Sequence, residues 1–397
     1  MNQEKFLFEW VPAIRMLCQN RGLPVVTVVE ESRNNKSMDE DDQMRDWMHR
    51  YGEKTMIMAG MEADGALNLG EIRRQIMEPA KRSIQEGLWI VLKGLGLLVA
   101  GPSYIANQAA IALQSHPAKR ERRGRFDGKV VAVTGGAQGF GQGIAERFFH
   151  EGAHLMLADL NIEKGTKLVT DLMGNANFNT AFFEPCDVTD ATSVKRMIMQ
   201  TVRYYGGLDV LISNAGVLVA GGLEDMTLED FKFVTEVNYT GFYNCTSAAA
   251  RVMKSQSEFS EHAFSDIIQI NSKSGLQGSH KNFAYAGSKF GSIGLVQSFA
   301  MELVSHRIKV NAICPGNYFD GPLWSDPETG LFSQYLNAGK VKGARNIADV
   351  RRYYEEKVPM KRGIEISDIM KAIYYVVDQN YETGQALPVT GGQIMLH

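Results

Sequence analysis

Short apolar runs alternate with helix-forming stretches over the last two thirds of the chain. The runs at residues 130–133, 154–158, 177–183, 208–212 and 267–270 have the length of strands that are buried on both faces. Helical patterns separate them, and the longest ends near residue 305. Strands that alternate with helices predict an α/β fold, a Rossmann-type doubly wound parallel sheet of about seven strands that spans residues 126–397.

The first of these runs ends in a glycine turn. Residues 129–143 read KVVAVTGGAQGFGQG, which predicts a strand, a turn and the start of a helix. A pyrophosphate binds the backbone N–H groups at such a helix N-terminus, where a Cβ would hold the ligand away. The spacing G-x3-G-x-G fits the general dinucleotide fingerprint only loosely, and alone it also fits a flexible hairpin. The residues expected at the cofactor are Thr134, Gly135, Gln138, Gly139, Phe140 and Gly141.

Further candidates for cofactor binding follow the other strands. Asp159 ends the second run, about 20 residues past the glycine turn, where an acidic residue accepts the ribose hydroxyls of an adenosine. Its charge would repel a 2′-phosphate, so NAD is favoured over NADP. Residues at later strand ends would let the cofactor lie on the edge of the sheet, and these are Asp187, Val188, Asn214, Ala215 and Gly216.

The fifth run leads to the candidate reacting residues. Ser272 follows it, and Tyr285 and Lys289 lie one turn apart in the long helical pattern. The lysine is expected to lower the pKa of the phenol, so that Tyr285 can remove the proton of a hydroxyl while a nicotinamide exchanges the hydride. Ser272 would hold the substrate oxygen, and Asn238 could hold a water behind Lys289. Tyr-x-x-x-Lys alone is common by chance.

Taken together, these motifs resemble those of the short-chain dehydrogenases/reductases. The resemblance extends from residue 126 to the end of the sequence and includes Pro315 and Gly316, which it places at the cofactor. The segments INSKSG, GSHKN, KVPMKRG and TGGQIM are similar to the branch of that family that oxidises sorbitol 6-phosphate at C2. This resemblance implies NAD-dependent oxidation of a polyol phosphate to a 2-ketose phosphate. The family usually has a threonine shortly after Pro-Gly that contacts the nicotinamide, whereas residues 317–321 here read NYFDG.

Two lysines flank the predicted reacting residues. Lys273 follows Ser272 directly, and Lys281 lies beside His280 just before Tyr285. An ammonium is a usual partner of phosphate, so we expect one or both lysines to bind the phosphate of the substrate. The alternative is that they are solvated loop charges, as most lysines are.

The first 125 residues are predicted to form a smaller, separate α/β domain. Residues 23–30 and 87–100 predict strands, residues 69–86 an amphipathic helix, and residues 117–125 a basic, solvated linker. Residues 87–114 resemble the late part of class II aldolase domains, which hold a divalent metal with histidines. The first 115 residues contain a single histidine, His49, so a degenerate domain kept for packing or assembly is favoured over a metal site.

Composition and charge argue against several other classes of function. The net charge of −3 provides no field for nucleic acid or an anionic membrane. Four scattered cysteines indicate neither a disulfide framework nor a zinc site, and no signal peptide is predicted, so a cytoplasmic location is expected. HEGAH at 150–154 matches the zinc-protease motif, but Gly152 predicts that the helix ends between the two histidines.

Several functions remain open on this basis. The first is a dehydrogenase for a polyol phosphate or for another sugar or polyol. The second is an NAD-sensing scaffold with a vestigial site, against which the intact Ser272, Tyr285 and Lys289 argue. A bifunctional aldolase-dehydrogenase is disfavoured by the missing histidines. The family habit implies a homotetramer or homodimer built through long helices such as the one with Tyr285.

Overall fold

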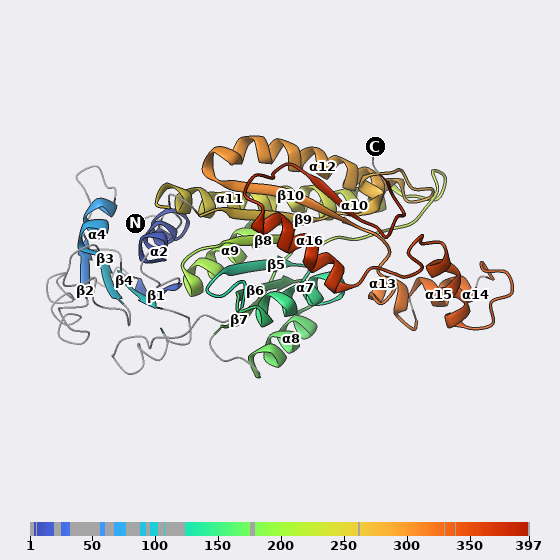
Figure 1. Ribbon diagram of the computed structural model, residues 1–397, viewed down its shortest axis with the longest axis horizontal. Helices are drawn as coiled ribbons and strands as arrows, with labels where there is room; N and C mark the ends of the chain where they lie inside the picture. The colour runs from blue at the N-terminus through green and yellow to red at the C-terminus, as the bar shows by residue number, and fades with distance from the viewer. Residues whose placement is uncertain are drawn as a thin grey trace.

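The computed structural model describes residues 4, 6–19, 25–31, 56–59, 67–76, 88–92, 96–101, 107, 124–174, 179–260, 263–328, 330–337 and 339–395. A seven-stranded parallel sheet forms its centre (Figure 1). The strand order is β11-β10-β9-β8-β5-β6-β7, which confirms the predicted Rossmann-type sheet. The order reverses between β5 and β8, which creates the crevice at the carboxyl edge where such sheets bind ligands. The strands are β5 (Val130–Thr134), β6 (His154–Asp159), β7 (Ala181–Pro185), β8 (Val210–Ser213), β9 (Ser265–Ile270), β10 (Ile308–Pro315) and β11 (Ala386–Val389).

Helices cover both faces of this sheet. One face packs against α7 (Gly139–His150), α8 (Ile162–Gly174) and α16 (Ile366–Asp378), and the other against α9 (Ala191–Tyr205), α11 (Gly241–Glu258) and α12 (Phe283–Leu303). Val130 and Ala132 of β5 belong to one hydrophobic cluster, and Val131 and Val133 belong to the other. Because successive side chains of a strand point to opposite faces, a strand between two helical layers must be apolar throughout.

A group of short helices lies beyond the carboxyl edge of the sheet. In Figure 1 it forms the end of the molecule opposite the N-terminal strands. It consists of α13 (Pro322–Ser325), α14 (Leu331–Asn337) and α15 (Ile347–Glu356), and it has a small hydrophobic core of its own around Phe319 and Phe332. The other short helices are α10 (Leu228–Thr235), η3 (Glu236–Thr240), η4 (Lys273–Gly275) and η5 (Val304–His306).

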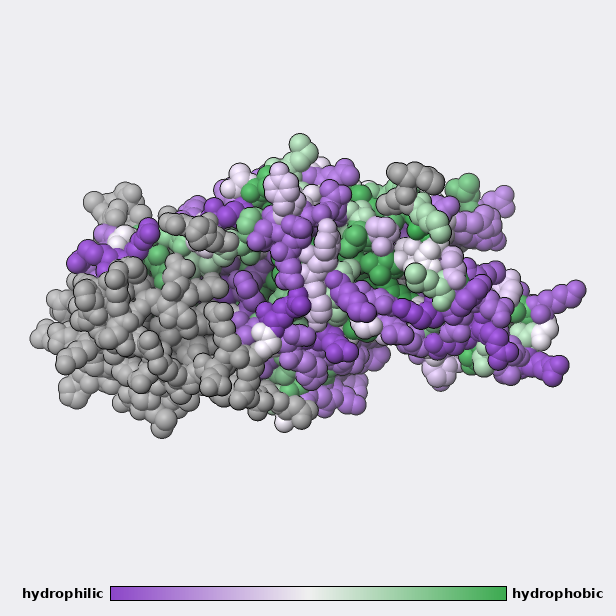
Figure 2. All heavy atoms as spheres, viewed as in Figure 1, coloured by the Kyte–Doolittle hydropathy of each residue, from purple (hydrophilic) through white to green (hydrophobic). Residues whose placement is uncertain are grey.

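Polar side chains predominate on the face of the molecule seen in Figure 2, with apolar groups gathered between them. Among the helices of the described residues, none combines the length and the apolar character that crossing a membrane requires.

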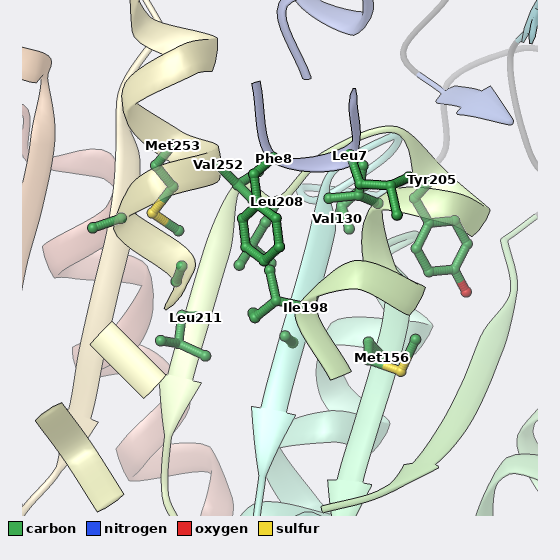
Figure 3. Close-up of a cluster of buried hydrophobic side chains, with 14 of the residues drawn as sticks. Leu7, Phe8, Val130, Met156, Ile198, Tyr205, Leu208, Leu211, Val252 and Met253 are labelled. Atoms are coloured by element: carbon green, nitrogen blue, oxygen red, sulfur yellow. The ribbon is translucent and has the colours of Figure 1, made fainter. Parts of the chain in front are cut away.

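The N-terminal helices share the core of the central sheet (Figure 3). η1 (Phe6–Trp10) and α2 (Val11–Gln19) pack against α9 and α11. Leu7 and Phe8 are almost fully buried in the same cluster as Val130 and Leu208. Residues 6–19 therefore complete the packing of the larger unit, while the division of the chain into two domains near residue 125 stays a prediction.

The remaining N-terminal elements form a second sheet with the order β1-β4-β3-β2. It contains β1 (Val25–Glu31), β2 (Met56–Ala59), β3 (Leu88–Leu92) and β4 (Gly96–Gly101), and α4 (Leu69–Ile76) packs beside it. The predicted strands at 23–30 and within 87–100 are thus confirmed, and the helix predicted over 69–86 is described as far as Ile76. His49, the alanine-rich stretch apart from Asn107, and the basic linker up to residue 123 lie outside the described residues.

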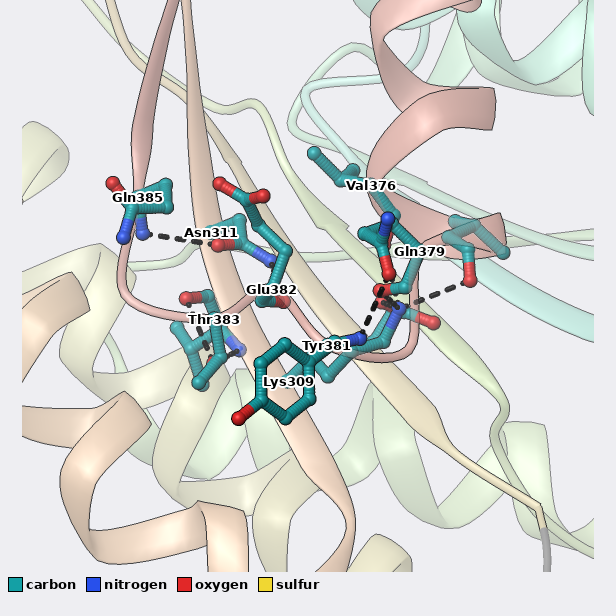
Figure 4. A network of polar contacts seen from close by, with 11 residues as sticks. Lys309, Asn311, Val376, Gln379, Tyr381, Glu382, Thr383 and Gln385 are labelled. Atoms are coloured by element: carbon teal, nitrogen blue, oxygen red, sulfur yellow. Dashed lines mark hydrogen bonds and ion pairs between the residues drawn. The ribbon is translucent and has the colours of Figure 1, made fainter.

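Charged groups at the amino edge of the central sheet are buried and paired. Arg15 of α2 donates to Asp209, with 2.6 Å between Nη2 and Oδ2, although the two residues are 194 positions apart. On the neighbouring strands, Lys309 Nζ lies 3.1 Å from Asp266 Oδ1. Lys309 also donates to the backbone carbonyls of Val376, Val377 and Gln379 at the end of α16 (Figure 4). A cation at a helix C-terminus satisfies carbonyls that have no partner within the helix.

Candidate active site

The glycine turn after β5 has no room for side chains at several of its positions. Gly135 and Gly139 have φ angles of +61° and +60°, a region that favours glycine. A Cβ on Gly141 would lie 2.0 Å from the carbonyl oxygen of Gly135, and a Cβ on Gly135 would lie 2.7 Å from Ala215 Cα. The backbone at the N-terminus of α7 is therefore bare, as binding of a pyrophosphate at this position requires.

Asn214 holds this turn in place from the end of β8. Its amide nitrogen donates to the carbonyl oxygens of Thr134 and Gly135 at 3.1 and 2.8 Å. The hydroxyl of Thr134 accepts the backbone N–H of Asn214 at 3.1 Å. The structure thus gives Asn214 and Thr134 a positioning role, while their contact with a cofactor stays a prediction.

Asp159 lies against the same turn. Its Oδ2 accepts the backbone N–H of Ala137 at 2.9 Å, and its Oδ1 accepts that of Asn161 at 2.8 Å. Each carboxylate oxygen keeps a further lone pair, so the ribose hydroxyls of an adenosine fit as additional donors. The bare helix N-terminus and this acceptor together fit a nicotinamide dinucleotide.

One cation near Asp159 and the glycine turn, Lys164, was not predicted from the sequence. Lys164, in the first turn of α8, donates from Nζ to Oε1 of Gln138 at 2.9 Å. Lys164 lies five positions after Asp159 in the sequence, and the first turn of α8 brings it back to the glycine turn. A search one helical turn past the acidic residue could have found it.

Asp187 and Val188 follow β7 as predicted. Their described contacts are with other residues of the protein and do not show a role at a cofactor. Asp187 Oδ1 accepts the N–H and the hydroxyl of Thr189 at 2.9 and 2.8 Å. Val188 is buried against Gly241, where a Cβ would lie 2.7 Å from its Cγ2. Their role at a cofactor stays a prediction.

Ser272, Tyr285 and Lys289 come together at the carboxyl end of β9. Ser272 is the N-cap of η4, where its hydroxyl accepts the N–H of Ser274 at 3.1 Å. Lys289 is buried, and its Nζ donates to the carbonyl oxygen of Ile270 at 3.0 Å and lies 5.7 Å from the centre of the Tyr285 ring. The predicted i,i+4 arrangement of tyrosine and lysine on one helix is confirmed.

The pKa values at this cluster correct one expectation. Burial raises the pKa of Tyr285, and a hydrogen bond with Ser272 opposes that increase. Burial also lowers the pKa of Lys289 to about 8. The expected lowering of the phenol pKa by Lys289 is therefore wrong, because desolvation outweighs the opposing hydrogen bond with Ser272 while the Lys289 ammonium donates to the carbonyl oxygen of Ile270.

Asn238 links this cluster to the loop that follows β8. Its Oδ1 accepts the N–H of Val217 at 2.8 Å, and its amide nitrogen donates to the carbonyl oxygen of Val217 and to Ser288 Oγ. A Cβ on Gly216 would lie 3.2 Å from Asn238 Oδ1 and 3.6 Å from Lys289 Nζ. The backbone at Gly216 therefore lies close to both side chains. The water that Asn238 was expected to hold stays a prediction.

The two candidate phosphate-binding lysines differ in their surroundings. Lys273 is partly buried, and desolvation lowers its pKa. Lys281 is exposed and has a φ of +61°, which is unusual for a residue with a Cβ. Its carbonyl oxygen accepts the N–H of Gly221, which ties the two loops beside Tyr285 together.

The loop after Pro315 and Gly316 lacks the expected threonine. Contacts with other segments of the chain hold this loop in position. A Cβ on Gly316 would lie 2.6 Å from Gln393 Oε1, so this backbone packs closely on the end of the chain. Tyr318 stacks on Phe140 of the glycine turn with 4.4 Å between the ring centres. Asp320 forms an ion pair with Arg351 at 2.7 Å, which joins the loop to α15.

The two histidines of the zinc-protease motif do not share a helix. His150 is the last residue of α7, and His154 is the first residue of β6. His154 is buried, with Nδ1 3.2 Å from the hydroxyl of Thr180. This arrangement confirms the predicted end of the helix between them.

Comparisons with known proteins agree on the larger part of the chain. A family model described as short chain dehydrogenase matches residues 129–324. Sorbitol-6-phosphate 2-dehydrogenase of Escherichia coli (strain K12) is 30% identical over 269 residues, which cover 67% of this chain and 99% of that protein. The crystal structure of sorbitol-6-phosphate 2-dehydrogenase from Erwinia amylovora is 31% identical, with a TM-score of 0.60 over 67% of this chain and all of that one. An actinorhodin polyketide ketoreductase, solved with NADPH, is 27% identical, with a TM-score of 0.58 over 66% of this chain and 96% of its own.

Proposed function

The chain belongs to the short-chain dehydrogenase/reductase family, and we propose that it oxidises the C2 hydroxyl of a polyol phosphate with NAD, converting sorbitol 6-phosphate to fructose 6-phosphate. The family membership makes it an oxidoreductase that acts on CH–OH groups with a nicotinamide cofactor. The observation that carries the proposal is the convergence of Ser272, Tyr285 and Lys289 beside a glycine cradle, with the partly buried Lys273 next to them.

The protein side of the reaction is a proton transfer. In the proposal, Ser272 Oγ hydrogen-bonds the C2 hydroxyl and directs its proton toward the phenol oxygen of Tyr285. The hydrogen bond from Ser272 favours the ionised phenol. Lys289, with a pKa of about 8, can pass the proton onward near neutral pH. A nicotinamide, when bound, supplies the acceptor of the hydride.

Lys273 supports a phosphorylated substrate. An ammonium that is partly buried loses hydration, and an anionic ligand restores favourable contacts to it. Lys281 would then be an outer, exposed contact on the adjoining loop. Binding at the phosphate would orient the hydroxyl against Tyr285, so its contribution would be seen in kcat/KM.

Asp159 supports NAD as the cofactor. Its carboxylate stands where the ribose hydroxyls would bind, and a 2′-phosphate placed there would meet a like charge. One of the similar structures was solved with NADPH, so the similarity alone does not select NAD. The preference for NAD is therefore part of the proposal.

The proposed assembly is a homodimer or homotetramer in the cytoplasm. α12 is rich in apolar residues, yet Phe290 and Met301 on it are exposed. A helix of that composition is normally buried, which supports contact of this face with a second copy of the chain.

The proposal is tested by following NADH absorbance with sorbitol 6-phosphate, other polyol phosphates and the free polyols. A preference for sorbitol 6-phosphate is expected. A variant with both Lys273→Gln and Lys281→Gln should lose more than about tenfold in kcat/KM on the phosphate and change little on free sorbitol. Lys254→Gln, on the distant α11, is the matched control. Equal losses on both substrates, or a wild type that prefers the free polyol, would contradict the phosphate site.

A further inference from the structure

Three side chains frame one corner of the glycine turn. Asp159 accepts the N–H of Ala137 at 2.9 Å, so its carboxylate lies against the turn. Gln138 is the next residue, and its Oε1 accepts a hydrogen bond from Lys164 Nζ at 2.9 Å. A carboxylate and an ammonium therefore approach the same short backbone segment from β6 and from α8.

The position of Lys164 is fixed by its own backbone. Asn161 donates its N–H to Asp159 Oδ1 at 2.8 Å, and Asn161 Oδ1 accepts the N–H of Lys164 at 2.9 Å. The start of α8 is thus tied to Asp159 through a chain of two hydrogen bonds. The side chain of Lys164 extends from this tether back toward the turn.

The chemistry of this corner concerns the adenosine ribose. An acidic residue at the end of the second strand binds the ribose 2′-hydroxyl, so the 2′ position lies within hydrogen-bond distance of Asp159. A 2′-phosphate in that place would meet the carboxylate of Asp159 and, at the next residue of the turn, the ammonium that Lys164 holds at Gln138. The ammonium has three N–H donors, and the bond to Gln138 uses one of them.

We infer that Lys164 is the residue that sets how strongly this protein discriminates between NAD(H) and NADP(H), because its ammonium, held at Gln138 next to the residue that Asp159 binds, offers the 2′-phosphate a charge-assisted partner. The inference deepens the proposed function and rests on its nicotinamide site. Asp159 alone would make the site reject NADP(H), and with Lys164 the site accepts it as a weaker second cofactor.

Direct binding tests this assignment without a polyol substrate. Dissociation constants for NADH and NADPH are measured from the fluorescence of the reduced nicotinamide. Lys164→Gln is expected to weaken NADPH binding about five- to tenfold, the scale of one exposed charge-assisted hydrogen bond, and NADH binding less than about twofold. Lys164→Arg should keep NADPH binding, and the effect of added salt on NADPH should be smaller in Lys164→Gln than in the wild type.

The matched control is Lys167→Gln, an exposed lysine on the same helix three residues later, which should alter neither constant. The inference is overturned if Lys164→Gln weakens both cofactors equally, if it weakens neither, or if the wild type binds no NADPH. Asp159→Asn separates this failure from failure of the proposed function. It should strengthen NADPH relative to NADH, and if it leaves the ratio unchanged, the adenosine ribose does not lie at this corner.

Discussion

Two buried lysines lie at opposite edges of the same sheet. Lys289 stands at the carboxyl edge and donates to a single backbone carbonyl, that of Ile270. Lys309 stands at the amino edge, where it contacts Asp266 and three carbonyls at the end of α16 (Figure 4). The two side chains are almost equally buried, at 3% and 2% exposure, so burial does not distinguish them.

Their partners do distinguish them. An ammonium surrounded by a carboxylate and helix-end carbonyls is fixed in place, and its contribution is to the stability of the fold. An ammonium with one carbonyl and a neighbouring phenol has a pKa of about 8 and can exchange a proton near neutral pH. The difference supports a role in folding for the amino edge, and it is consistent with the chemistry proposed for the carboxyl edge.

Tyr285→Phe should have the largest effect and tests the carboxyl edge. It removes the oxygen that accepts the proton, so kcat should fall about 10²- to 10⁴-fold. The Tm and NADH affinity should change little, because the ring and its packing remain. Steady-state kinetics and thermal unfolding measure the two properties. Tyr381→Phe, at a tyrosine that is 99% exposed, is the control. A near-normal kcat would remove Tyr285 from the mechanism.

Parallel substitutions of the two lysines compare the edges directly. Lys309→Met leaves Asp266 buried without its cation and should lower the free energy of unfolding by about 3 kcal/mol, with kcat nearly unchanged in the folded protein. Lys289→Met removes a buried charge with no carboxylate partner, so stability should hold or rise while activity is lost. Urea unfolding and NADH absorbance give both readings. If the two variants lose stability equally, the distinction by partners fails.

Arg15→Met extends the comparison to the N-terminal helix. Arg15 and Lys129 hold the pKa of Asp209 below its usual range against the effect of burial. Without Arg15, Lys129 at 4.0 Å and the N–H of Val130 remain as partners, so we expect a loss of about 2 kcal/mol in stability. The value of kcat/KM should be unchanged, because the ion pair lies at the edge away from Ser272. Arg73→Met, on the exposed side of α4, should cost almost nothing. A loss of activity without a loss of stability would contradict this reading.

The smallest predicted effect is the change of the free energy of unfolding with pH. Burial raises the pKa of Asp266 from 3.8 to about 7, with Lys309 opposing it. The folded state then binds more protons than the unfolded state between these values, so stability should fall as pH rises through this window, by at most about 1.4 kcal/mol per pH unit. Lys289 acts in a separate window, since its pKa falls from 10.5 to about 8 and stability should rise between those values.

Asp266→Asn should flatten the acidic part of this profile and leave the alkaline part intact. Chemical unfolding across the pH range, with wild type and variant side by side, measures both windows. An unchanged slope between pH 4 and pH 7 in Asp266→Asn would show that another group titrates there.

The elements of the central sheet and the placement of the candidate reacting residues were largely predictable because their signals are local. The run of apolar residues around Val131 and Val133 predicted a strand between two helical layers, and the structure has one. The spacing of Tyr285 and Lys289 predicted a shared helix face. The missed features involve contacts between segments. The ion pair of Asp320 with Arg351 has no signal in either segment, whereas the contact of Lys164 with Gln138 follows from the helical turn that begins after Asp159.

By itself, the sequence determined the glycine turn, the order of strands and helices, and the shared helix of Tyr285 and Lys289. These follow from backbone preferences and periodicities that act over a few residues. The tertiary structure alone decided that α2 inserts Arg15 beside Asp209, and that burial raises rather than lowers the pKa of Tyr285. Desolvation and ion pairing depend on which distant segments pack together, and in this chain that packing pairs Arg15 with a residue 194 positions away.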